Sequence, residues 1–95
     1  MLDSGKMIRY FYALIDSFDG LVSDDVAVDE DQKVTVKDHY SFFTYLDDAF
    51  NSSSVIADYA LDVLPIGNHQ YLFSIALKNH SDYLTTFAYL VKEAK

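Results

Sequence analysis

The sequence predicts a two-layer α+β fold in a single acidic globular domain, residues 1–95, with the order helix, hairpin, helix, hairpin, helix (α-β-β-α-β-β-α). Three stretches repeat apolar residues at helical spacing, and alternating stretches flank two groups of turn residues. Hydrophobic residues make up 51% of the chain, which is enough to form a core despite the charge. We therefore expect a four-stranded antiparallel sheet, made of two hairpins, with three helices packed on one face.

The first helix is expected over residues 4–19. Ser4 stands at the N-cap position, and Gly20 ends the helix. The apolar stripe is formed by Met7, Phe11, Leu14 and Phe18.

In residues 21–37, apolar and polar residues alternate over short stretches, which predicts a β-hairpin. The polar turn 29–33 separates its two strands, whose apolar residues are Val26 and Val28, then Val34 and Val36. We expect Asp29, Glu30 and Asp31 to form a solvent-exposed tip, because burying three consecutive carboxylates together would be costly.

A second helix is expected over residues 38–50, with Asp38 as its N-cap and Asn51 to Ser54 as the break that follows. Its buried stripe is formed by Phe42, Phe43, Leu46, Ala49 and Phe50.

Residues 55–64 fit two structures. As a strand they place Asp58 and Asp62 on one face and apolar residues on the other; as a helix capped by Ser54 they place the same two acids at i and i+4. The strand is preferred because residues 65–69 form a turn and further alternation follows. That alternation consists of Tyr71, Phe73, Ile75 and Leu77.

The last helix is expected after Ser81, which would be its N-cap. Its apolar side would be formed by Leu84, Phe87, Ala88 and Val91.

Charge is the most informative feature of the composition. The formal net charge is −8, and the stretch between Tyr10 and Gln32 holds seven acids and no Lys or Arg. Of the 15 acids, 13 are Asp, whose short side chain holds the charge close to the backbone. Such an array suits a rigid basic surface, whereas direct binding to nucleic acid or to an anionic membrane would oppose the charge.

No pattern for catalysis, a cofactor or a metal emerges, so we expect a non-enzymatic protein without any of them. His39, His69 and His80 lack ligand spacing, and a calcium loop beginning at Asp29 would have Val34 where glycine is required. Cysteine is absent, no signal peptide pattern is present and no long apolar run occurs, which favours a cytoplasmic location.

The leading hypothesis is an inhibitor or interaction protein whose acidic face occupies the basic, nucleic-acid-binding surface of a partner such as a nuclease. In size and charge alone, the chain resembles the small acidic antirestriction and anti-CRISPR proteins of phages and the immunity proteins of nucleases. The expected partner-binding residues are Asp24, Asp25, Asp29, Glu30 and Asp31, with Asp47 and Asp48 as a second cluster.

The alternative is a homo-oligomeric structural or assembly module, such as a homodimer, in which the acids only maintain solubility. A contiguous exposed apolar patch, rather than an exposed acidic one, would distinguish this alternative.

Overall fold

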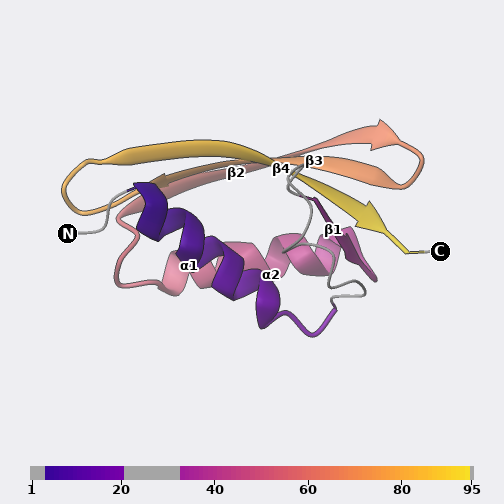
Figure 1. The fold of residues 1–95 in the computed structure, drawn as a ribbon, viewed down its shortest axis with the longest axis horizontal. Helices are drawn as coiled ribbons and strands as arrows, with labels where there is room; N and C mark the ends of the chain where they lie inside the picture. Colours follow the sequence, from indigo (N-terminus) through magenta and orange to yellow (C-terminus); the bar gives the residue numbers. More distant parts are fainter. Residues whose placement is uncertain (1–3, 21–32, 95) are drawn as a thin grey trace.

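Both helices lie on the same face of a four-stranded sheet in the computed structural model, which describes residues 4–20 and 33–94 (Figure 1). In chain order the elements are α1 (Ser4–Asp16), β1 (Lys33–Val36), α2 (His39–Ser52), β2 (Asp58–Gly67), β3 (Gln70–Lys78) and β4 (Leu84–Glu93). The α+β class is confirmed. Neither described helix is long and apolar enough to cross a membrane.

The sheet is mixed, with the strand order β1-β4-β3-β2. β2, β3 and β4 form an antiparallel meander, and β1 pairs with β4 in parallel, so the expectation of an entirely antiparallel sheet was wrong. The two hairpin connections make β4 run in the same direction as β2. The connection through α2 leaves β1 running in that direction too, so β1 pairs with β4 in parallel. Val26 and Val28, the other half of the expected first hairpin, lie outside the described residues.

The expected last helix was also wrong, because residues 84–93 form strand β4. Residues at a spacing of two face the helix layer here: Thr85, Phe87, Tyr89 and Val91. Ser81 is not a helix cap. Its backbone N–H, like that of Tyr83, donates to Oδ1 of the buried Asn79, at 2.9 and 3.0 Å, and these bonds hold the connection between β3 and β4.

The strand interpretation is confirmed for residues 58–64, since β2 pairs antiparallel with β3. Residues 55–57 precede the strand, and residues 65–67, which were expected in the turn, continue it. The two central residues of the hairpin turn, Asn68 and His69, have φ angles of 55° and 60°. Positive φ at both positions is the geometry whose twist matches that of the flanking strands. Pro65 lies at an irregularity in the register of β2, where the missing N–H of proline is tolerated.

One core fills the space between the helices and the sheet. The expected N-cap of α2 is confirmed: the Asp38 carboxylate accepts from the backbone N–H groups of Tyr40 and Ser41. α1 ends at Asp16, earlier than expected. The largest side chains with almost no exposed surface are Tyr89, Phe11, Phe42, Phe50, Phe73, Met7, Ile15, Leu46 and Leu77. Complete burial of each Phe, Met, Ile or Leu side chain stabilises the fold by about 1.5–3 kcal/mol relative to an exposed one.

The outer face of the sheet, opposite the helices, carries small side chains at its centre. Register places the following residues there, exposed or half-buried: Ala60, Ser74, Ala76, Thr86 and Ala88. Because strand residues alternate between faces, each of these positions neighbours an inward-facing core residue. The sheet therefore has one buried and one accessible face.

Candidate functional site

Tyr59 joins the edge of the sheet to the helix layer. Its strand, β2, is one edge of the described sheet, and its half-buried ring lies 5.6 Å from the ring of Phe50 in α2. The Tyr59 hydroxyl donates to Oδ1 of Asp47 at 2.7 Å. This bond fixes the Asp47 carboxylate beside β2, across the break that follows α2.

Three carboxylates affect the pKa of that hydroxyl. The hydrogen bond to Asp47 raises the pKa of Tyr59, and partial burial and the negative charges of Asp47, Asp48 and Asp58 raise it further. Like charges nearby disfavour the ionised phenolate, which is why acids of α2 and β2 raise this pKa. We call Asp47, Asp48, Asp58 and Asp62 the acidic edge.

Asp62 extends the acidic edge along β2. Asp58 lies opposite Lys78 in the register and Asp62 opposite Ser74, so both acids occupy the outer face of the sheet. Four residues of strand separate them by roughly 13 Å. The Lys78 ammonium group is 3.5 Å from Oδ1 of Asp82, so its charge is shared with an acid outside the acidic edge.

Shallow depressions of the outer face adjoin the acidic edge. One of about 270 Å³ is lined by Asp58, Tyr59, Ala60, Ala76, Lys78 and Leu84. Another, of about 350 Å³, extends across the strands from Asp62 to Thr86 and Ala88. Leu64 and Leu84, each 59% exposed, enlarge the apolar area. Negative charge and accessible apolar surface therefore lie side by side.

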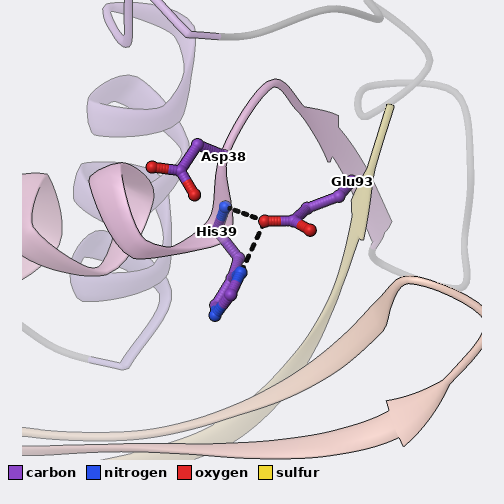
Figure 2. A group of neighbouring side chains, drawn as sticks. All are labelled: Asp38, His39 and Glu93. Carbon is purple, nitrogen blue, oxygen red and sulfur yellow. Dashed lines mark hydrogen bonds and ion pairs between the residues drawn. The ribbon is translucent and has the colours of Figure 1, made fainter. Parts of the chain in front are cut away.

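A second polar cluster lies at the N-terminus of α2. Figure 2 shows Glu93 reaching His39 from β4, with the Asp38 side chain beside them. Oε2 of Glu93 accepts from the His39 backbone N–H at 2.8 Å and lies 2.5 Å from His39 Nδ1. The His39 ring stacks on Tyr71, with 3.6 Å between the ring centres. The cluster thus fastens the start of α2 to β3 and β4.

Hydrogen bonding occupies the acids of this cluster. Bonds from the His39 backbone and side chain lower the pKa of Glu93, and bonds from Ser41 and the first turn of α2 lower the pKa of Asp38. Ligand atoms of Asp38, His39 and Glu93 lie within 4.8 Å of one another, close enough to share a cation. A cation would compete with the bonds that cap α2, so we interpret the cluster as a structural lock.

Only some of the partner-binding residues expected from sequence lie within the part of the chain that the structure describes. Asp24, Asp25, Asp29, Glu30 and Asp31 lie outside the described residues, so their expected hairpin tip and role stay predictions.

Asp47 is half-buried and bonded to Tyr59, whereas Asp48 is exposed on α2. Sequence reasoning placed Asp58 and Asp62 on one face of a strand but did not join them to Asp47 and Asp48. The alternation of acids in residues 58–62, read together with the acids of the preceding helix, is the signal that indicates this grouping.

Comparisons with known proteins add no relative: the chain matches no family model, no curated protein and no solved structure.

Proposed function

We propose that this protein is a non-enzymatic interaction protein that occupies the basic, nucleic-acid-binding surface of another protein, such as a nuclease. The observation that carries the proposal is the acidic edge beside the apolar outer face of the sheet. The charge of −8 for the whole chain supports the same assignment.

Charge and apolar area act at different stages of such binding. Carboxylates steer a protein toward a positively charged groove and compete there with phosphate groups. Apolar surface at the centre of an interface then stabilises the complex because binding removes it from contact with water. Polar groups remain at the rim. Ala60, Ala76 and Leu84 supply the apolar part, with Asp58 and Asp62 beside them.

In this proposal His39 and Glu93 hold α2 against the sheet and take no part in a reaction. No cofactor is required, because the action is competition for a surface. The absence of cysteine supports a cytoplasmic location.

The test compares two double variants with the same change in charge. Asp48→Lys/Asp62→Lys reverses exposed acids of the acidic edge, and Asp16→Lys/Asp19→Lys reverses exposed acids on and just after α1. Each tagged protein is used to capture partners from a nuclease-containing lysate, which mass spectrometry identifies. The affinity of each purified partner is then measured in rising salt and against a DNA duplex competitor.

We expect the wild type and the α1 control to retain a basic nucleic-acid-binding protein that the duplex displaces. The acidic-edge variant should bind it about tenfold more weakly, since reversal replaces attraction by repulsion at two positions. Salt should weaken wild-type binding, because exposed charges are screened over about 8 Å at physiological ionic strength. An affinity that changes neither with salt nor with either double reversal would contradict the proposal.

A second candidate, the homo-oligomeric module, is favoured by the exposed apolar side chains of the outer face, above all Leu64 and Leu84. It predicts a concentration-dependent dimer in sedimentation experiments. Ala88→Glu, which adds a charge at an exposed outer-face position, would then yield a monomer with an unchanged fold.

A further inference from the structure

The free edge of β2 is the most specific docking feature among the described residues. β2 closes one side of the sheet, with β3 as its neighbour on the other side. A strand in this position presents a row of backbone N–H and C=O groups that another extended chain can pair with. From Asp58 to Leu64, before Pro65 interrupts the donors, this edge offers seven residues. The Tyr59 N–H within it donates to Oδ1 of Asp58 at 2.9 Å, a bond that an added strand would replace.

We propose that β2 binds an extended basic segment of the partner, which adds to the sheet as a further strand. This inference rests on the proposed function and names the part of the partner that the acidic edge contacts.

Charge lies on both sides of the free edge. Asp58 and Asp62 stand on the outer face, while Asp47 and Asp48 of α2 lie on the helix side near Tyr59. Side chains of an added strand alternate between the same two faces, with directly opposite Cβ atoms about 4.5–5.5 Å apart. A basic residue on the outer face would therefore meet Asp58 or Asp62, whereas Asp47 on the helix side already accepts from the Tyr59 hydroxyl.

The spacing specifies the segment. Asp58 and Asp62 are four residues apart on one face, so the added strand should carry Lys or Arg four residues apart. Ala60 lies between the two acids, and Leu64 follows beyond them on the same face. The position between the two basic residues should therefore be apolar.

A second copy of this chain fits the edge less well. In a symmetric antiparallel pair of β2 strands centred on Ala60, Asp58 of each copy faces Asp62 of the other. Like charges directly opposite one another destabilise a sheet. Centring the pair on Leu61 instead makes the Asp62 side chains of the two copies diagonal neighbours, about 7–8 Å apart, with no basic residue of β2 to offset them.

Three capped synthetic peptides test the proposal, each as long as the segment from Asp58 to Leu64. The first carries two lysines four residues apart among valine and threonine. The second has the same composition with its lysines three residues apart, which places them on opposite faces of a strand. The third is the first peptide with N-methyl groups on two adjacent central amides, which removes a backbone donor from each of its edges. Affinity is measured by titration calorimetry, and amide exchange in β2 is measured by NMR.

We expect the first peptide to bind about 1.4- to fivefold more tightly than the second, because the second loses one of the two cross-strand charge pairs, each of which contributes about 0.2–1 kcal/mol. N-methylation should weaken binding about tenfold or more. Amide exchange should slow within residues 58–64, and Asp58→Lys/Asp62→Lys should abolish the preference for the first peptide, while Asp16→Lys/Asp19→Lys keeps it.

Equal affinity for all three peptides, or no slowing of exchange in β2, would overturn the added strand. The proposed function would stand in that case if the purified partner still binds Asp48→Lys/Asp62→Lys more weakly than the α1 control. Loss of that difference would remove the proposed function as well.

Discussion

The lock between α2 and β4 provides a stability test with a defined pH signature. Glu93 is only 12% exposed, and one of its oxygens contacts both the backbone N–H and the ring of His39. Glu93→Gln keeps an acceptor in place but removes the charge, and charge-assisted hydrogen bonds are about twice as strong as neutral ones. We expect a loss of about 1 kcal/mol in the free energy of unfolding at pH 7.

That loss corresponds to a fall of about 4–8 °C in the melting temperature for a domain of this size. Its sign with pH follows from Glu93, whose pKa lies below its ordinary value of 4.5 in the folded state. The stabilisation is therefore complete above about 4.5 and is lost as the pH falls through the lowered folded pKa. Wild type and Glu93→Gln should converge in acid.

Guanidinium unfolding from pH 7 down to pH 3 measures the difference between the two proteins. Lys92→Gln is the matched control, because it changes an exposed neighbour on β4 and should stay within about 0.5 kcal/mol of the wild type. Identical midpoints at pH 7, or a gap that persists unchanged at pH 3, would refute the lock.

Three further substitutions test other contacts by chemical unfolding. Tyr59→Phe removes the bond to Asp47 and should cost about 0.5–1.5 kcal/mol; because the pKa of Tyr59 is raised, this advantage of the wild type should hold below pH 10 and fade above it. Asn79→Ala leaves two backbone donors without their acceptor and should cost about 1–3 kcal/mol, whereas an unchanged midpoint would show that the β3–β4 connection does not depend on this side chain. Phe73→Ala empties a fully buried position and should cost about 3–5 kcal/mol; a loss below 1 kcal/mol would contradict its place in the core.

The elements predicted correctly from sequence are those with local signals. Apolar residues at helical spacing locate α1 and α2, and Asp38 marks the start of α2. The β2–β3 hairpin follows from two alternating stretches around a short turn. Each of these signals lies within a few residues of the structure it specifies.

For residues 84–93, local sequence patterns do not distinguish a helix from a strand. Leu84, Phe87 and Val91 fit a helical stripe, while Phe87, Tyr89 and Val91 fit one face of a strand. The strand forms where β3 offers an antiparallel partner and β1 a parallel one. Pairing with β1 joins residues more than fifty positions apart, as does the contact of His39 with Glu93, and no local pattern encodes either.

The acids of β2 give the sheet edge a preference for one sign of charge. An exposed edge strand attracts any extended chain, and natural proteins limit this with charged residues and proline. Asp58, Asp62 and Pro65 supply those features on β2. The same two carboxylates that repel another copy of this strand attract a basic one, so protection from self-association and selection of a partner arise from one set of charges. In the proposed function, this is why the acids at the edge of the sheet are placed to recognise a partner and not only to keep the protein in solution.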